Sequence, residues 1–279
     1  MESRQVIGLI AGMGRLPEIL AEAVKAKGHG LVWVTVSGEE PSASRIADYT
    51  YRTTFGELDG VRSILQTHHV RRVLLAGGVP RALLVGSGNT ALGQELARLG
   101  DRRDQPVLVL FAQLLAQIGV TVISPLEFVR ELVVEAGVLT RRGPSEAEWA
   151  DIRFGMPVAR AVAALDVGQT VAVKSGVILA VEAAEGTDAT IQRAGSLVDG
   201  VRVIKAARPS QDERFDLPTI GTQTIEVLKT ARASLLALEA GRTLLLDRKQ
   251  TIAAADAAGI ALVGVEPVAL SAGAVGPRT

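Results

Sequence analysis

The amino-acid sequence predicts an α/β protein with two domains, the first built on a mostly parallel sheet and the second on a mixed sheet. Short apolar runs alternate with helical patterns through the first half, which is typical of parallel strands covered by helices on both faces. A charged, turn-rich stretch at 140–150 interrupts this pattern, and Lys174-Ser175-Gly176 later joins two strands as a hairpin would. We therefore predict a first domain at 1–139, a linker at 140–150 and a second domain at 151–279.

The first domain is predicted to alternate strands and helices along the chain. Pro17 lies in the first turn of the first helix and Gly28 at its end, where these residue types are favoured. The uncharged stretch after Pro106 contains Gln113 and Gln117, so a buried helix and strand explain it better than a membrane span. The predicted strands are 6–10, 31–36, 71–78 and 120–125, and the predicted helices are 16–28, 57–69 and 107–119.

The second domain is predicted to combine a hairpin with helix–strand units. The hairpin spans 170–182, and a helix starts near Thr187. A long loop at 190–221 then carries an unusual concentration of charged and amide side chains. The remaining predicted elements are helices at 151–169, 222–241 and 248–259 and strands at 243–247 and 260–265.

Composition excludes several classes of function. The formal net charge is zero and aromatic residues make up 3% of the chain, which argues against nucleic-acid binding. The chain contains no cysteine, so disulfides and thiolate metal sites are excluded. The first residues lack the basic and long apolar regions of a signal peptide, which predicts a cytoplasmic protein. A mean hydropathy of +0.28 suits large buried surfaces, an oligomer interface or an apolar substrate.

Two glycine-containing turns follow predicted strands of the first domain. Gly12-Met13-Gly14 stands between the first strand and helix, where backbone amides could approach a phosphate. Pro17 replaces the third glycine of the dinucleotide fingerprint, and no acid ends the second strand, so a nicotinamide cofactor is disfavoured. Gly77-Gly78 is a weaker ligand candidate. For both turns the alternative is a tight chain reversal without a ligand.

The histidines do not predict a catalytic or metal site. His29, His68 and His69 lack the spacing of a metal-ligand set, and we expect them to be solvated. No G-x-S-x-G motif is present, so a serine hydrolase of that kind is not supported.

The polar loop at 190–221 is the stronger candidate for a site. Asp216 stands among Phe215, Leu217 and Pro218, and a carboxylate with such neighbours is rarely placed for solubility. Asp212 or Asp216 could bind a divalent metal or orient a water, while lysine and arginine offset charge on phosphate oxygens. This combination suits attack on a phosphoanhydride. Thr187 or Asp188 could instead simply cap a helix.

The ordered motifs resemble the LpxI family of UDP-2,3-diacylglucosamine pyrophosphatases. The resemblance rests on "GLIAGMGRLP", "LLAGGVPR", the stretch 151–193, "QDERFDLPTIG" and "LLLDR", and it extends to about Val265. It implies a Rossmann-like N-terminal half and a magnesium-dependent hydrolase that holds its substrate between two domains. The products implied are UMP and 2,3-diacylglucosamine 1-phosphate (lipid X), an intermediate of lipid A biosynthesis in Gram-negative bacteria.

The resemblance also implies roles for particular residues. Asp216 matches the essential aspartate of the family and is also a candidate magnesium ligand, and Lys205 and Arg214 are expected to offset phosphate charge. The family tends to carry a paired acid before the uncharged helix, whereas this chain has Asp104 followed by Gln105. The candidate substrate-binding residues are Gly12, Met13, Gly14, Gly77, Gly78, Gln169, Lys174, Glu182, Thr187, Asp188, Arg193, Gln211 and Asp212.

Three rival interpretations remain open at this point. A non-catalytic nucleotide-sugar-binding protein would bind the same ligand without releasing UMP. A nicotinamide-dependent oxidoreductase is argued against by the missing ribose acid, and a scaffold protein has no use for the polar loop. A homodimer and a loose, peripheral association with the inner membrane also stay open as expectations.

Overall fold

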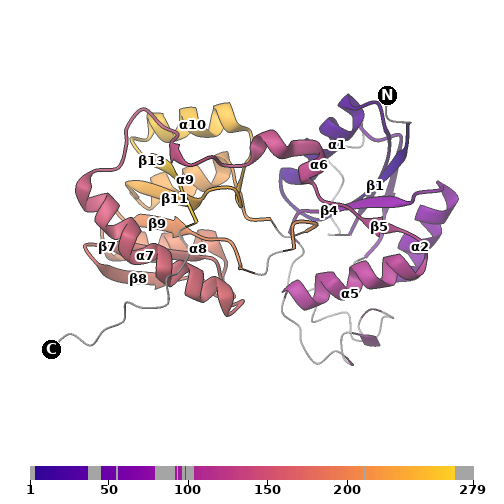
Figure 1. Cartoon of the computed structure of the whole chain (residues 1–279), viewed down its shortest axis with the longest axis horizontal. Coiled ribbons are helices and arrows are strands. Elements are labelled where there is room, and N and C mark those ends of the chain that lie inside the picture. The colour runs from indigo at the N-terminus through magenta and orange to yellow at the C-terminus, as the bar shows by residue number, and fades with distance from the viewer. Residues whose placement is uncertain are drawn as a thin grey trace. The chain divides into compact units, whose positions relative to one another are not determined.

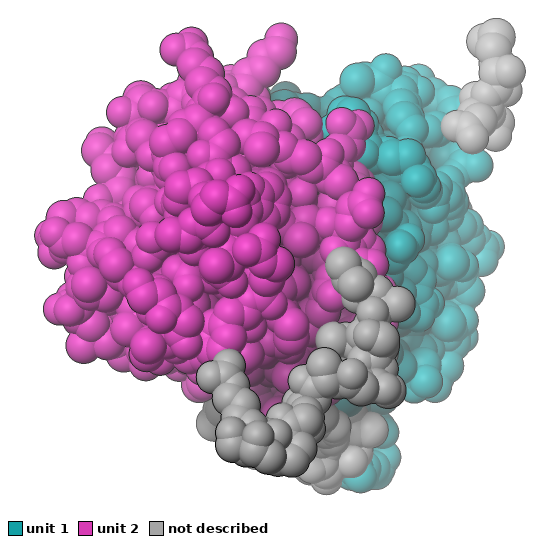
Figure 2. Space-filling view, turned by 60° about the vertical axis from the view of Figure 1, so that its left-hand side comes forward, with its two compact units in different colours: residues 1–131, 211–217 teal, residues 132–210, 218–279 magenta. Residues whose placement is uncertain are grey.

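The computed structural model describes residues 4–36, 45–54, 56–78, 92, 94–95, 98, 104–209, 212–215 and 217–267. The chain divides into two compact units, coloured separately in Figure 2. Unit 1 comprises Met1–Glu131 with Gln211–Leu217, and unit 2 comprises Leu132–Ser210 with Pro218–Thr279. The division therefore falls at Leu132, and residues 140–150, which the sequence predicted as a linker, lie within unit 2.

Unit 1 is built on a five-stranded parallel sheet in the order β3-β2-β1-β4-β5, of which β1, β4 and β5 are labelled in Figure 1. This confirms the predicted mostly parallel sheet. The strands are β1 Val6–Ala11, β2 Gly30–Thr35, β3 Tyr49–Arg52, β4 Arg72–Ala76 and β5 Thr121–Val122. The helices are α1 Leu16–Ala26, α2 Leu58–Thr67, α5 Asp104–Gln117 and α6 Leu126–Val129, and a 3-10 turn η2 follows at Arg130–Leu132.

Crossovers between parallel strands are nearly always right-handed, so connections that run in opposite directions are expected to place their helices on opposite faces of the sheet. The connection through α1 runs from β1 to β2, whereas those through α2 and α5 lead toward β4 and β5 in the other direction. Side chains of α2 and α5 accordingly share one buried cluster with the sheet, including Val61, Phe111 and Leu115. Both faces of the central strands are covered, so their apolar residues run continuously instead of alternating.

No helix in the described part of the chain is both long and apolar enough to cross a membrane. Helix α5, which contains most of the uncharged stretch after Pro106, is instead partly buried against the sheet of unit 1, as its glutamines suggested.

Unit 2 is built on a six-stranded mixed sheet in the order β6-β13-β11-β9-β7-β8. β9, β11 and β13 are parallel to one another. β7 is antiparallel to both β8 and β9, and β6 is antiparallel to β13. This confirms both the hairpin and the mixed sheet. The strands are β6 Gly137–Val138, β7 Thr170–Lys174, β8 Val177–Val181, β9 Arg202–Lys205, β11 Leu235–Glu239 and β13 Ala261–Val265, with β10 Thr219–Ile220 paired to β12 Leu244–Leu245 in a separate ribbon. The helices are α7 Glu146–Ala164, α8 Thr187–Leu197, α9 Thr222–Thr230 and α10 Arg248–Ala257.

The predicted helix at 222–241 is wrong in its second half. α9 ends at Thr230, and Leu235–Glu239 forms β11 between two parallel neighbours. Its residues, Leu-Leu-Ala-Leu-Glu, favour a helix intrinsically, but every one of them is buried in the sheet. The predicted loop at 190–221 is likewise interrupted, because α8 continues to Leu197 and β9 occupies Arg202–Lys205.

The start of α7 is fixed by a capping box. Ser145 accepts a hydrogen bond from the Glu148 amide, and the Glu148 carboxylate accepts one from the Ser145 amide. Glu148 is buried and also accepts hydrogen bonds from Arg142 and from the Ser234 hydroxyl at 2.7 Å. Burial alone would raise the pKa of Glu148, but these donors outweigh it and lower the pKa from 4.5 to about 2.

We expect unit 2 to lose stability in acid through Glu148. Its carboxylate has a lower pKa in the folded than in the unfolded chain, so its contribution is present above the unfolded value of 4.5 and is lost as the pH falls toward 2. The full contribution is about 3 kcal/mol. Urea unfolding at about pH 6 and about pH 3 should show a loss of about 2 kcal/mol of it, because the folded carboxylate is still mostly ionised at pH 3, and Glu148→Gln should flatten the difference. Equal pH dependence in the two proteins would contradict this assignment.

Candidate functional site

The two glycine turns of unit 1 meet at the carboxyl edge of its sheet. β1 and β4 are parallel neighbours, so the residues that follow them leave the sheet side by side. The Met13 amide donates to the Gly78 carbonyl at 2.8 Å, and the Gly78 amide donates to the Met13 carbonyl at 3.0 Å. The Gly12 amide donates to the Ala76 carbonyl at 2.8 Å. These three amides therefore hold the turns together, and a phosphate would have to compete with those bonds.

Close backbone approach explains why glycine occupies these positions. A Cβ at Gly12 would lie 2.4 Å from the Gly78 carbonyl oxygen, and one at Gly77 would lie 2.5 Å from the Met13 carbonyl oxygen. Gly77 and Gly14 also have positive φ angles of 89° and 98°. The glycines thus have a structural explanation, which the sequence left open beside phosphate binding.

A polar cluster lies at the carboxyl edge of the parallel strands of unit 2. Lys205 ends β9, and the antiparallel β7 begins opposite it, with Thr170 facing Lys205 in the register. β8 ends next to the start of β7, and α8 begins six residues after that strand. The topology therefore brings the following predicted residues to one edge, and we name them the carboxyl-edge cluster: Gln169, Glu182, Thr187, Asp188 and Lys205.

A chain of hydrogen bonds connects the members of this cluster. The Lys205 ammonium donates to the Thr187 hydroxyl at 3.1 Å, and that hydroxyl donates to Glu182 Oε1 at 2.8 Å. Glu182 Oε2 accepts a hydrogen bond from the backbone N–H of Gln169 at 3.1 Å. Lys205 is only 9% exposed, so its ammonium is held in one place by Thr187 instead of moving freely in solvent.

Burial shifts the ionisation of this cluster. Burial lowers the pKa of Lys205, against the opposing influence of Glu182 and Asp188, and Arg208 lowers it further. Burial also raises the pKa of Asp188, which the Lys205 ammonium opposes and the Glu182 carboxylate reinforces. A buried ammonium of this kind loses its proton more readily than the ammonium of a surface lysine. While it stays protonated, it interacts more strongly with an anion.

Buried ion pairs support the neighbouring backbone. Arg208 pairs with Asp166 at 2.5 Å, and Arg160 pairs with Glu239 at 3.2 Å. Glu239 Oε2 also accepts from the Ala207 amide at 2.8 Å. These contacts fix the chain that follows β9, directly after Lys205. Sequence reasoning missed Glu239, because its strand resembled a helix; an acid at the end of an apolar run was the available signal.

The structure separates Lys174 from the cluster. Lys174 lies at the opposite end of β7 from Thr170 and donates to the Asp199 carbonyl near the hairpin tip. Arg193 of α8 lies beside the cluster, because it donates to Glu185 at 2.6 Å and to the carbonyl of Val181, next to Glu182, at 3.0 Å.

The end of the polar loop belongs to unit 1. Asp212 and Arg214 form a two-point ion pair, with Nε donating to Oδ1 at 2.9 Å and Nη2 to Oδ2 at 2.6 Å. This pairing lowers the pKa of Asp212 and raises that of Arg214. Arg214 therefore already has a carboxylate partner, unlike an arginine reserved for substrate. Gln211 and Asp216 lie outside the described residues.

The described residues show no preformed metal site. No group of three or more His, Cys, Asp or Glu side chains among them is placed to hold an ion. The side chain of Asp104 also lies outside the described part of the chain. The expectation of solvated histidines is wrong for His29, which is 5% exposed and packs edge-on against Phe128.

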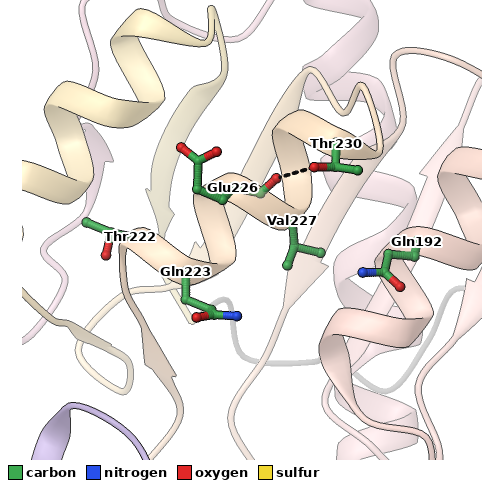
Figure 3. Close-up of a pocket in the computed structure, with 6 residues that line it drawn as sticks. All are labelled: Gln192, Thr222, Gln223, Glu226, Val227 and Thr230. Atoms are coloured by element: carbon green, nitrogen blue, oxygen red, sulfur yellow. Dashed lines mark hydrogen bonds between the residues drawn. The ribbon is translucent and has the colours of Figure 1, made fainter.

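A surface hollow between α8 and α9 of unit 2 does not coincide with the cluster. It has a volume of about 370 Å³, and the Thr230 hydroxyl bonds to the Glu226 carbonyl at its wall (Figure 3). Its lining residues are Gln192, Thr222, Gln223, Glu226, Val227 and Thr230. None of these was a predicted site residue.

Comparisons with known proteins cover nearly the whole chain. The family model of the LpxI N-terminal domain matches residues 6–132, and that of the LpxI C-terminal domain matches residues 135–263. A curated relative, the UDP-2,3-diacylglucosamine pyrophosphatase LpxI of Caulobacter vibrioides, is 34% identical over 277 residues, covering 94% of this chain and 98% of that protein. A solved structure of glycinamide-RNase-transformylase T from Mycobacterium tuberculosis covers 63% of this chain and 43% of its own at 15% identity, with a TM-score of 0.24 that supports no argument.

Proposed function

Because this chain belongs to the LpxI family, we infer that it is a UDP-2,3-diacylglucosamine pyrophosphatase of lipid A biosynthesis. The observation that carries this inference is the agreement of both family models with a relative that matches over 94% of the chain. The reaction proposed is hydrolysis of the diphosphate to UMP and 2,3-diacylglucosamine 1-phosphate. Water forms a bond to one phosphorus, the bond from that phosphorus to the bridging oxygen breaks, and the water loses a proton.

We propose that Lys205 stabilises negative charge on a phosphate oxygen. An ammonium has three hydrogens to donate, and one of them is directed to Thr187. Thr187 gives its own hydrogen to Glu182, so its role is to orient Lys205 instead of binding the substrate. Fixed donors in a buried site stabilise developing charge without reorganising, which is usually a large part of enzymatic rate enhancement.

The carboxylates of the cluster are compatible with this role. Glu182 is occupied by the Thr187 hydroxyl and the Gln169 amide, which disperse its charge. Burial raises the pKa of Asp188, and the attraction of the Lys205 ammonium for its carboxylate opposes that shift. We propose that Gln169, Glu182 and Asp188 shape and neutralise the surroundings of Lys205 and that Lys205 itself contacts phosphate.

We propose that Asp216 is the carboxylate that orients or deprotonates the attacking water. Its neighbours Phe215 and Leu217 are assigned to unit 1, together with the Asp212–Arg214 turn. Within that turn Asp212 is paired with Arg214, which lowers its pKa and makes it a poor base. Asp216, and not Glu213, is proposed because it matches the essential aspartate that the family resemblance implies.

Magnesium dependence stays a prediction of the family resemblance. Among the described residues no three or more metal-ligand side chains are gathered at one place. Magnesium is commonly bound by one or two carboxylates together with substrate phosphates, so such a cluster is not required. Loss of activity in EDTA and its return with magnesium would support the requirement, and full activity in EDTA would remove it.

The function is tested by incubating the purified chain with UDP-2,3-diacylglucosamine and following UMP by ³¹P NMR and mass spectrometry. Release of UMP and lipid X supports the proposal. Binding of the substrate without release of UMP, with or without magnesium, would favour the nucleotide-sugar-binding alternative.

Hydrolysis in ¹⁸O-labelled water identifies the attacked phosphorus. The label appears in UMP if water attacks the phosphorus of the UMP half, and in lipid X if it attacks the other phosphorus. Co-sedimentation with vesicles and analytical ultracentrifugation test the predicted membrane association and homodimer.

A further inference from the structure

A short segment of the C-terminal half is inserted into unit 1. Gln211–Leu217 belong to unit 1, although Ser210 on one side and Pro218 on the other belong to unit 2. The chain therefore passes from one unit to the other after Glu131, after Ser210 and after Leu217. A loop that only connects two elements of unit 2 does not need to enter unit 1, so particular contacts are expected to hold the segment there.

The side chain of Phe215 is the buried anchor of this segment. Only 2% of Phe215 is exposed, and it belongs to the apolar cluster that contains Ile10 of β1, Leu75 of β4 and Phe111 of α5. The Ser124 hydroxyl, which precedes α6, donates to the Glu213 carbonyl at 2.9 Å. Among the described residues of the segment, the Phe215 ring and the hydrogen bond to the Glu213 carbonyl therefore hold it to unit 1.

The polar residues of the segment stiffen it from within. The Phe215 amide donates to the Asp212 carbonyl at 3.2 Å, and the Arg214 amide donates to Asp212 Oδ1 at 3.0 Å. The Arg214 guanidinium, paired to Asp212, lies over the Phe215 ring at 5.4 Å from its centroid. Asp212 and Arg214 therefore complete a rigid turn on the exposed side of the buried ring.

We propose that Phe215 is a positioning residue for the hydrolysis: its buried ring anchors the turn Asp212–Phe215, which directly precedes Asp216 in the sequence. This inference rests on the proposed role of Asp216 as the reacting carboxylate. Adjacent Cα atoms are about 3.8 Å apart, so an anchored Phe215 restricts where the next carboxylate can reach. A displacement of about 1 Å in a catalytic group can cost about 100-fold in rate.

Phe215→Ala and Phe111→Ala form a matched pair of variants. Both remove a buried ring from the same apolar cluster, but Phe111 lies on α5 and is distant in sequence from Asp216. We expect both to lower the melting temperature, whereas only Phe215→Ala should lower kcat for UMP release by about 100-fold with KM changed less than about threefold. Phe215→Leu keeps an apolar anchor and should recover most of kcat.

The difference in kcat between the two variants decides the inference. A loss in Phe215→Ala at least about tenfold greater than in Phe111→Ala supports positioning, and a smaller difference overturns it. If Phe215→Ala does not fold, Ser124→Ala carries the test, because it removes only the bond to the Glu213 carbonyl. A kcat loss of about fivefold or more in that variant supports the inference, and a smaller one overturns it.

Limited proteolysis gives a readout that is independent of turnover. Trypsin cleaves after Arg214, and we expect at least about tenfold faster native-state cleavage there in Phe215→Ala than in Phe111→Ala. Equal cleavage rates would contradict the anchor. Full activity of Asp216→Asn would refute the proposed carboxylate itself, whereas an inactive Asp216→Asn beside an active Phe215→Ala would refute only the anchor.

Discussion

Asp216→Asn is expected to reduce kcat for UMP release by at least about 1,000-fold while the protein stays folded. Asparagine has nearly the shape of aspartate but can neither accept a proton nor carry the negative charge that orients water. Substrate binding should survive, since phosphate contacts are proposed for Lys205 and not for Asp216. The measurements are steady-state UMP release, substrate titration by calorimetry and the melting temperature of the variant.

The matched control for this variant is Asp199→Asn. Asp199 forms an exposed ion pair with Arg232 in unit 2, and exposed pairs of this kind contribute at most about 1 kcal/mol. The kcat of Asp199→Asn should stay within about twofold of the kcat of the unmodified protein. Substantial turnover by Asp216→Asn would remove Asp216 from the mechanism. Equal losses in both variants would point to a general disturbance of the protein.

Lys205→Met is expected to lower kcat/KM by about 100-fold. Methionine keeps the length and apolar stem of lysine but removes the ammonium that Thr187 orients. Lys229→Met, which removes an exposed lysine paired with Glu226, should change kcat/KM by less than about twofold. A Lys205→Met enzyme with unchanged kcat/KM would show that this ammonium does not contact the reacting phosphate.

The pH profile provides a second test of Lys205. Burial lowers its pKa, so the ammonium becomes neutral at a lower pH than a surface lysine with its value of about 10.4. Activity that needs the positive charge is therefore present below the lowered pKa and declines as the pH rises through it. This decline of kcat/KM should be absent from the residual activity of Lys205→Met. An identical decline in both proteins would assign it to another group.

Local sequence patterns predicted much of the fold because many elements carry their own signals. The hairpin was found from Lys174-Ser175-Gly176, in which Ser175 and Gly176 both adopt positive φ. The first strands were found because each is a short run of apolar residues followed or preceded by a helical pattern. β11 was missed because a strand buried on both faces loses the alternation that distinguishes it from a helix.

The candidate site was predictable in part. The sequence placed Lys205, Thr187 and Glu182 among the candidates from residue type alone, and the sheet register joins them in one hydrogen-bonded chain. It did not indicate that Asp212 and Arg214 neutralise each other, because their pairing depends on the turn between them. Nor could it show that the Gly12 and Met13 amides bond across to the second glycine turn and the end of β4.

The sequence by itself determined the α/β class, the glycine turns, the hairpin and the ordered motifs that led to the family. Only the tertiary structure decided that Phe215 is buried in unit 1 and that Lys205 meets Thr187 at a sheet edge. Periodicity and turn chemistry describe neighbours within a few residues along the chain. Burial and ion pairing depend instead on segments far apart in sequence, whose meeting is set by strand order and register.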